Sequence, residues 1–359
     1  MELVVLNEKF QRIFIIDDYE SFMWIDRYNS PGEFELYATV TEDLLTYPTV
    51  NNYLYFDKSE HLMIIEDIAI DTNSTTGNHI KIVGRSLESI LDRRIVWKQT
   101  TCTGELETCL KKLFGENIAT ISGYTTQPSG TEGNKRKISN FKFQASGDSY
   151  INDLTMDTQF TGDNLLDIVC SVCQEADIGF KIILDDNNDF VFSLYTGVDR
   201  SYDQDNLPYV VFSPSFENII SSNYLAEYSK YKNVALVAGE GEGSSRRTKS
   251  VGTTSGLLRK EMFVDARDLQ SSEVSDYNKA LTDRGKEKLA ENKVKREFDG
   301  KCETSNLYVY DRDFHIGDIL QVSNEYGMES PSRIVEFIWN HSSSGLEAYP
   351  TFAPMDEEE

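Results

Sequence analysis

Two cysteines have the spacing of a reactive thiol pair, because Cys170 and Cys173 form a Cys-x-x-Cys motif. In a redox enzyme such a pair lies at a helix N-terminus, where the helix dipole lowers the thiol pKa. Here the pair falls two turns inside a predicted helix that opens at residues 161–163, with Asp163 as its N-cap, and closes at Gly179. No second Cys-x-x-Cys or Cys-x-x-His completes a zinc site. We therefore interpret both cysteines as buried packing residues, since a free cysteine behaves as a small hydrophobic side chain.

The stretch Gly239-Glu240-Gly241-Glu242-Gly243 has a glycine spacing like that of a phosphate-binding loop. A Walker loop also needs a Lys-Ser/Thr pair at its end and a helix behind it, and this stretch has neither. Its two glutamates would repel phosphate. We interpret it as a flexible loop between β elements, followed by the basic pair Arg246-Arg247.

The remaining chemistry-bearing residues form no recognisable constellation. No histidine lies three to five residues from another His or Cys, and no Gly-x-Ser-x-Gly elbow is present. The 60 Asp and Glu residues can contain a glycosidase pair, but most of them must be solvated surface. Lys135-Arg136-Lys137 is a basic tip, interpreted as a solvated loop. The sequence therefore predicts no catalytic, cofactor-binding or metal-ligating residue. The histidines are His61, His79, His315 and His341.

Composition and charge exclude several classes of protein. The chain has 359 residues, which corresponds to two or three domains at roughly 100–200 residues each. Lys and Arg total 35 and Asp and Glu total 60, so the formal net charge is 35 − 60 = −25. This balance argues against a free-standing nucleic-acid binder and against docking on an anionic membrane, because both need basic residues. Hydrophobic residues are 39% and aromatic residues 11%, which indicates a folded, soluble, acidic protein.

The sequence contains no recognisable targeting or membrane signal. The N-terminus lacks the basic start and the long apolar run of a secretory signal. The longest apolar stretches are far shorter than the roughly 20 residues that span a bilayer, so we expect no membrane anchor. Five cysteines are an odd, sparse set, which indicates synthesis in a reducing cytoplasm and not a disulfide framework.

The elements that must position these residues are mostly strands. Residues 33–40 place Phe34, Leu36, Ala38 and Val40 on one face, the period-two pattern of a half-buried strand. Similar short runs fill residues 1–97 and suggest an antiparallel barrel or sandwich. The predicted strands are residues 2–6, 11–16, 21–28, 33–40, 53–56, 62–71 and 79–83.

Residues 98–204 mix helix and strand. An apolar stripe predicts a helix over 104–114, and the helix at 161 follows a long exposed loop or irregular hairpin at 122–149. Residues 180–184 and 190–195 then predict a β-hairpin across an Asp-Asp-Asn-Asn turn.

β patterning returns in residues 205–265 and again in 303–352. Between them, residues 275–296 are rich in charged residues and Ala, with Leu281 and Leu289 as sparse apolar points, which predicts one solvent-facing helix. Residues 356–359 are a charged tail. The order along the chain is β, α+β, β, helix, β. The later predicted strands are residues 209–212, 232–240, 308–310, 318–322 and 334–339.

Several stretches, taken together and in order, resemble the siphovirus tail-hub-like family found in phages and prophages of Gram-positive bacteria. The resemblance runs from about residue 1 to residue 352, and none of its motifs is catalytic. The stretches are 84–97 (GRSLESILDRRIVW), 161–166 (TGDNLL), 195–201 (YTGVDRS), 231–243 (YKNVALVAGEGEG) and 317–322 (GDILQV) with 325–327 (EYG).

The resemblance implies a baseplate hub or tail-associated protein at the distal end of a phage tail tube. Such hubs form trimeric rings whose subunits each carry two β-barrels, which matches a sixfold tube to a threefold tip. The implied partners are the distal tail protein, the tail tube, the tape-measure protein and a tail-tip fibre or receptor-binding protein, with transient passage of DNA. The acidic balance suits such a conduit if the acids face its lumen. The implied location is the virion tail, after synthesis in the host cytoplasm.

We therefore expect a mainly β fold with α+β inserts. Residues 1–97 with 205–238 are the predicted first β-barrel domain, 98–204 an inserted α+β domain, 239–352 a second β-barrel domain carrying the helix 275–296, and 353–359 an acidic tail. Longer relatives continue into peptidoglycan hydrolase or receptor-binding modules. Because this chain stops at Glu359, we expect no such module and no catalysis. Two alternatives stay open: a tail-associated wall hydrolase using a carboxylate pair, and a saccharide-binding adhesin that uses some of the 19 Tyr and 19 Phe residues.

Overall fold

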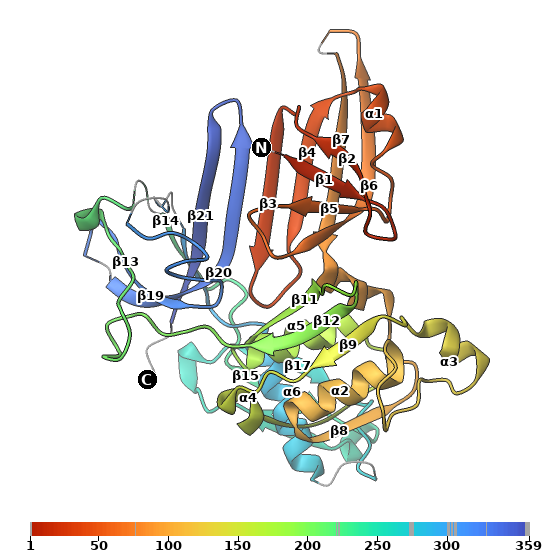
Figure 1. Ribbon diagram of the computed structural model, residues 1–359. Coiled ribbons are helices and arrows are strands. Elements are labelled where there is room, and N and C mark those ends of the chain that lie inside the picture. Colours follow the sequence, from red (N-terminus) through yellow and green to blue (C-terminus); the bar gives the residue numbers. More distant parts are fainter. Residues whose placement is uncertain are drawn as a thin grey trace.

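The computed structural model describes residues 2–75, 77–219, 221, 223–272, 276–299, 302, 304, 307–327 and 329–355. Strands dominate, which confirms the prediction of a mainly β protein. Figure 1 shows two neighbouring groups of strands, coloured red to orange and blue, above a region of mixed helices and strands. In the described part of the chain the buried apolar side chains gather into three hydrophobic cores. No helix in these ranges has both the length and the hydrophobicity needed to cross a bilayer.

The first group of strands is built on β4 (Glu33–Thr39). Its buried and partly exposed residues alternate, so Phe34, Leu36 and Ala38 face the core as the period-two pattern predicts. β4 pairs antiparallel with β3 on one edge and with β7 on the other. The sheet continues in the order β7-β6-β5-β1-β2. The bounds are β1 Leu3–Leu6, β2 Arg12–Ile16, β3 Ser21–Arg27, α1 Glu42–Thr46, β5 Tyr53–Phe56, β6 Leu62–Asn73 and β7 Gly77–Ser86.

The long strand β20 (Glu329–Ser342) joins the second group to the first. The first part of β20 pairs with β19, and its later part pairs with β3. β21 pairs with β20 along most of its length. Aromatic rings pack across this joint, with Phe56 5.5 Å from Trp24 and 5.6 Å from Trp339 between ring centroids. The other bounds are β13 Val211–Phe212, β14 Asn223–Glu227, β18 Lys295–Asp299, β19 Ile319–Ser323 and β21 Gly345–Pro354.

The two groups therefore form one sheet with a shared core. Within the described residues, its main path ends at β2 on one side and at β14 on the other, and hydrogen bonding closes no barrel. β13 pairs with β19, off the main path.

The mixed region has its own core, in which α2 and α5 pack with the hairpin β11–β12. The hairpin pairs antiparallel over residues 179–195, as the sequence predicts. Phe114 of α2 and Phe192 of β12 have ring centroids 4.5 Å apart in this core. The bounds are η1 Leu87–Arg93, β8 Thr100–Glu105, α2 Leu106–Asn117, α3 Thr131–Arg136, β9 Phe141–Gln144, α4 Ser149–Asp153, β10 Thr155–Phe160, α5 Leu165–Glu175, β11 Gly179–Leu184 and β12 Phe190–Tyr195.

The third core lies between α6 (Tyr277–Ala290) and a small sheet of order β16-β15-β17. Gly285 lets the helix approach this sheet closely, because a Cβ there would lie 2.6 Å from Val251 Cγ2 and 2.8 Å from Val237 Cγ2. The bounds are β15 Val234–Ala238, β16 Thr248–Val251 and β17 Glu261–Asp265, with single 3₁₀ turns at η2 Pro214–Phe216, η3 Gly243–Ser245 and η4 Gly256–Leu258.

The predicted helices have different ends in the structure. The helix predicted over 104–114 is α2, which spans Leu106–Asn117, because Gly104 and Glu105 belong to β8. The N-cap of α5 is Asn164 and not Asp163: Asn164 Oδ1 accepts from the Leu166 amide at 2.8 Å, while the Asp163 carboxylate accepts from the Thr161 amide. α5 ends at Glu175, well before the predicted stop at Gly179, which instead opens β11. α6 ends at Ala290, and the last residues of the predicted helix 275–296 belong to β18. Ser275 lies outside the described residues.

Other local predictions also need correction. The stretch 122–149, predicted as a loop, contains α3, β9 and the start of α4. The predicted strand 308–310 is reduced to an isolated bridge between Tyr310 and Phe314. Ala353 and Pro354 belong to β21, and the charged residues 356–359 of the predicted acidic tail 353–359 lie outside the described residues.

Strand pairing connects segments that are far apart in the chain. Residues 205–238 are predicted to complete the first barrel, and in this range β13 and β14 pair with the late strands β19 and β18. β15 to β17 and α6 form a separate small unit, and β19 to β21 join the sheet of β3. The division of the chain into domains stays a prediction. A local sequence pattern predicts that a strand exists, but it does not identify the distant strand with which that strand pairs.

Candidate functional site

Cys170 and Cys173 lie within α5, in the positions that the sequence predicts. Cys173 is buried, Cys170 is partly buried, and both are free thiols. Burial raises the pKa of Cys170 to about 12 and raises the pKa of Cys173 well above its usual value. Neither side chain is a thiolate near neutral pH, which supports the packing interpretation.

A second thiol pair escaped the sequence analysis. Cys102 on β8 and Cys109 on α2 are both buried and form a hydrogen bond with each other. This hydrogen bond raises the pKa of Cys102 and lowers that of Cys109. The two residues lie on different elements and at no motif spacing, so no local pattern predicts their contact.

The glycine-rich stretch at 239–243 is held as a structural turn. Arg246 donates to the carbonyl oxygens of Gly239 at 2.9 Å and Ala238 at 2.7 Å. The backbone amide of Glu240 donates to the Tyr277 hydroxyl at 2.8 Å. This amide is therefore occupied by α6 and does not face a ligand. A Cβ on Gly239 would lie 2.2 Å from the same hydroxyl oxygen. The geometry therefore explains the glycine without a phosphate.

The four histidines do not converge. His79 pairs with Glu20, His315 lies 3.8 Å from Asp318, and His341 packs against the ring of Tyr19. In the described ranges, no group of three or more His, Cys, Asp or Glu side chains is arranged to hold a metal ion.

His61 differs from the other histidines because it is buried, lies beside the buried carboxylate of Glu88 and is influenced by the charge of the buried Asp26. His61 Nδ1 is 3.1 Å from Glu88 Oε1, and that same oxygen accepts from the Ile182 amide of β11 at 2.8 Å. On the other side, Asp26 accepts from Ser59 Oγ at 2.7 Å and from Trp24 Nε1 at 2.9 Å. The cluster thus ties β3, the start of β6 and η1 to the mixed region.

The opposite charges of His61 and the neighbouring carboxylates set the protonation state of this cluster. Burial by itself would lower the pKa of His61, but the carboxylates of Asp26 and Glu88 outweigh it and raise the pKa to about 9. Burial would raise the pKa of Glu88, but His61 lowers it below its usual value. Burial also raises the pKa of Asp26. His61 is therefore an imidazolium at neutral pH, paired with a charged Glu88.

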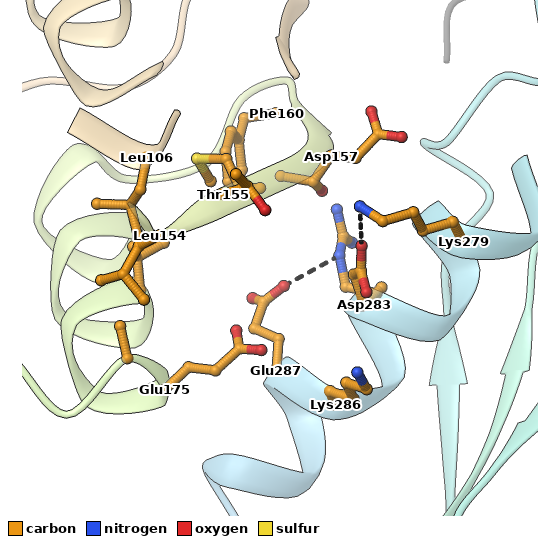
Figure 2. A pocket seen from close by; sticks show the side chains of 15 residues that line it. Leu106, Leu154, Thr155, Asp157, Phe160, Glu175, Lys279, Asp283, Lys286 and Glu287 are labelled. Atoms are coloured by element: carbon orange, nitrogen blue, oxygen red, sulfur yellow. Dashed lines mark ion pairs between the residues drawn. The ribbon is translucent and has the colours of Figure 1, made fainter. Parts of the chain in front are cut away.

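A cavity of about 350 Å³ lies between α5, β10 and α6. Figure 2 shows Glu175 reaching into it from α5 and Glu287 from α6, with Leu106, Leu154 and Phe160 forming an apolar side. The bases nearby belong to α6. Arg284 Nε is 3.3 Å from Glu287 Oε2, and the Lys279 ammonium is 3.3 Å from an Asp283 carboxylate oxygen.

The carboxyl groups in this cavity are perturbed. Burial, helped by the nearby charges of Glu287 and Asp283, raises the pKa of Glu175 to about 7. Burial also raises the pKa of Glu287. A carboxylic acid with a pKa near neutrality can donate or accept a proton at physiological pH, which is the property that a general acid needs. The sequence did not single out Glu175 and Glu287, because the chain has 60 acidic residues and no spacing distinguishes these two from the others.

The contacts of Glu287 also have a structural purpose. Glu287 accepts from Ser171 of α5 at 3.4 Å, and Arg284 donates to the carbonyl of Gln159 at 3.2 Å and pairs with Asp268 at 3.0 Å. These bonds connect α6 to α5 and β10, so the cavity lies where the mixed region meets the small unit of α6 and β15 to β17.

The predicted basic tip at 135–137 is more ordered than a solvated loop. Lys135 and Arg136 form the last turn of α3. Arg136 donates to the carbonyl oxygens of Ile95 at 2.6 Å and of Gln127, and its guanidinium lies 5.1 Å from the centroid of the Trp97 ring.

A family model described as Siphovirus ReqiPepy6 Gp37-like protein matches residues 2–352. No curated protein matches the chain.

Three solved structures have the same fold over nearly their whole length. The 43 kDa tail protein of prophage MuSo2 from Shewanella oneidensis is 9% identical, with a TM-score of 0.59, over 99% of this chain and 98% of that one. The prophage tail protein gp18 from Listeria monocytogenes is 13% identical, with a TM-score of 0.54, over 100% and 96%. The tail protein from Neisseria meningitidis is 12% identical, with a TM-score of 0.56, over 99% and 96%.

Proposed function

Because the chain belongs to the Siphovirus ReqiPepy6 Gp37-like family of siphovirus tail proteins, we propose that it is the baseplate hub of a phage tail. In this role it closes the distal end of the tail tube, adapts its sixfold symmetry to a threefold tip, and catalyses no reaction. The observation that carries the proposal is the family match over residues 2–352. The fold shared with prophage tail proteins along the whole chain supports it.

The assembled form in this proposal is a homotrimer in which each subunit supplies two similar β units. β1 to β7 form one unit and β13, β14 and β18 to β21 form the other, and the two meet where β20 pairs with β3. Three chains then present six units to the tube. A closed ring of this kind uses head-to-tail contacts, so one face of each subunit meets a different face of the next.

The proposed partners follow from the position at the tip. They are the distal tail protein, the tail tube and the tape-measure protein above the ring, and a fibre or receptor-binding protein below it, with DNA passing transiently. The protein is proposed to be made in the host cytoplasm and to reside in the virion tail.

The proposal is tested on the particle itself. The gene is deleted from the phage and complemented with a tagged copy, and tails are imaged by electron microscopy. We expect the label at the distal tip, in threefold symmetry, and no mature tip without the protein. Label along the tube or at the head, or normal tips after deletion, contradicts the hub. A stable twofold dimer preserved in the tail contradicts it as well.

One observation favours a second function, a cell-wall hydrolase that uses Glu175 and Glu287. The cavity and the raised pKa of Glu175 suit a general acid, with Glu287 as the second carboxyl group of the pair. Zymography on cell walls decides between the two functions. The hub predicts no clearing by the wild type, whereas the hydrolase predicts clearing that Glu175→Gln abolishes and that the exposed-surface control Glu132→Gln retains.

A further inference from the structure

A basic pocket lies where η1 and α3 end, on the mixed region. It is a shallow cavity of about 370 Å³ lined chiefly by Arg93, Arg94, Trp97, Lys135 and Arg136. Asp92 and Ile95 complete its lining. We use the name basic pocket for this set of residues.

Neutral oxygens hold two of the three guanidinium groups of the basic pocket in place. Arg94 Nε donates to the carbonyl of Arg136 at 2.9 Å, and Arg136 Nη2 donates to the carbonyl of Ile95 at 2.6 Å. Among the described residues, none of the three arginines has an Asp or Glu oxygen within 4 Å. The charges of Arg94 and Arg136 are therefore fixed in position, and no carboxylate neutralises them.

The acids near the basic pocket are already engaged. Asp92 is 3.0 Å from Arg85 and accepts from Asn164 Nδ2 at 2.9 Å, and Glu132 is 2.6 Å from Lys135. Burial and the neighbouring guanidiniums lower the pKa of both Arg94 and Arg136, which reflects mutual repulsion. A chain with 60 acids and 35 bases thus keeps a cluster of unneutralised arginines together. This arrangement is stabilised when an anion enters.

The pocket also has the apolar component of a protein interface. Trp97 is 55% exposed, whereas the other two tryptophans, Trp24 and Trp339, are buried. Ile95 beside it is 43% exposed. Tryptophan and arginine are the residue types that dominate binding energy at protein interfaces. A long polyanion such as DNA is disfavoured here, because the rest of the chain, at −25, repels it over a wide area.

We propose that the basic pocket docks a carboxylate-bearing segment of a second copy of this chain. The proposal rests on the homotrimer of the proposed function and names the face that the trimer uses. Every copy carries a net charge of −25, so copies associate only where positive charge faces carboxylates and outweighs the general repulsion. In a head-to-tail ring the basic pocket of one subunit meets a different, acidic surface of the next.

The test compares self-association of matched charge variants. Arg93→Glu with Lys135→Glu reverses two exposed charges of the pocket. The Arg93 side chain makes no hydrogen bond or ion pair with the described residues, and Lys135 loses only an exposed ion pair with Glu132, so we expect folding to be preserved. Lys230→Glu with Lys249→Glu, two exposed lysines elsewhere, changes the net charge equally. Sedimentation equilibrium at 10–500 μM protein and roughly 0.15 M salt, where the Debye length is about 8 Å, gives the association constants.

We expect the pocket variant to associate at least tenfold more weakly than the wild type and the control to stay within twofold. Trp97 emission should shift to shorter wavelength as the wild type associates, because the neighbouring copy covers the indole. Equal association of the three proteins overturns the proposal, as does a wild type that stays monomeric throughout. A shift of Trp97 emission on adding an oligonucleotide or inorganic phosphate to monomeric protein also overturns it, in favour of a free-anion site.

Particle imaging separates this proposal from the hub itself. If the tip contains a threefold ring of this protein and the Arg93→Glu, Lys135→Glu variant still builds that ring, only the docking face is wrong. If the protein is absent from the tip, the proposed function fails independently of the solution measurement.

Discussion

The buried ion pair of His61 and Glu88 makes the stability of the protein depend on pH in a specific window. The pKa of His61 is about 9 in the folded state and about 6.5 when unfolded. A histidine whose pKa is raised on folding contributes stability that is fully present below pH 6.5 and is lost as the pH rises through 9. The difference corresponds to about 3 kcal/mol, at about 1.4 kcal/mol for each pH unit in the window.

The measurement is urea unfolding between pH 6.5 and 8.5, followed by tryptophan fluorescence. Trp24 donates to Asp26 in the same cluster and so reports the relevant region. We expect the wild type to lose about 2–3 kcal/mol of unfolding free energy over this range. His61→Gln should be less stable at pH 6.5 by about 3 kcal/mol, because Glu88 is left buried without its partner, but its stability should hardly change up to pH 8.5.

The control is His315→Gln, which changes a half-exposed histidine and should keep the wild-type slope. The reasoning is refuted if wild-type stability is flat between pH 6.5 and 8.5. It is also refuted if the His61→Gln protein shows the wild-type slope, because the pH dependence then comes from other groups.

Three further changes test other parts of the structure. Because folding raises the pKa of Glu175 from 4.5 to about 7, ionising this residue destabilises the folded protein; the cost begins above pH 4.5, is complete above pH 7, and is limited by solvent screening to about 1 kcal/mol. In denaturant titrations, Glu175→Gln should therefore raise the unfolding free energy by about 1 kcal/mol at pH 8 and leave it unchanged at pH 4. Changing Cys170 and Cys173 to Ala should cost about 1 kcal/mol or more and leave tail assembly intact, and fast alkylation of the folded wild type would contradict their burial. Gly239→Ala should lower the stability by about 1–3 kcal/mol in thermal melts, because its methyl group collides with the Tyr277 hydroxyl, and an unchanged melting temperature would mean that this contact is loose.

The sequence pattern predicted those parts of the fold that depend on only a few neighbouring residues. The alternation in β4 and the Asp-Asn turn of the β11–β12 hairpin both appear in the structure, because side-chain alternation and tight turns are encoded within a few residues. The pairing of β20 with β3 was not predictable in this way. It brings Trp339 opposite Trp24, and residues so far apart in the chain leave no shared pattern in a local window.

The candidate sites were harder to predict for the same reason. His61 and Glu88 belong to different elements, and Glu175 and Glu287 come from different helices. Each is one acid or histidine among many until folding removes water and brings it beside its partner. The N-cap of α5 shows a smaller failure: Asp163 and Asn164 are both good caps, and the structure uses Asp163 to hold the Thr161 amide instead.

Two of the stretches that carry the family resemblance, residues 195–201 and 317–322, contact each other in the structure. Asp318, buried at the start of β19, accepts from the Val198 amide at 2.7 Å and pairs with Arg200 at 3.1 Å. A Cβ on Gly197 would lie 1.7 Å from the Gly317 carbonyl oxygen, so the two backbones can approach only because this position is glycine.

Arg333 of β20 connects this contact to the mixed region. It donates to the Gly317 carbonyl at 2.5 Å, pairs with Asp177 at 2.6 Å, and lies 5.2 Å from the centroid of the Tyr28 ring. One buried guanidinium therefore holds together the first strands, the segment before β11 and the late strands. These contacts of Arg333 connect three segments that are far apart in the sequence.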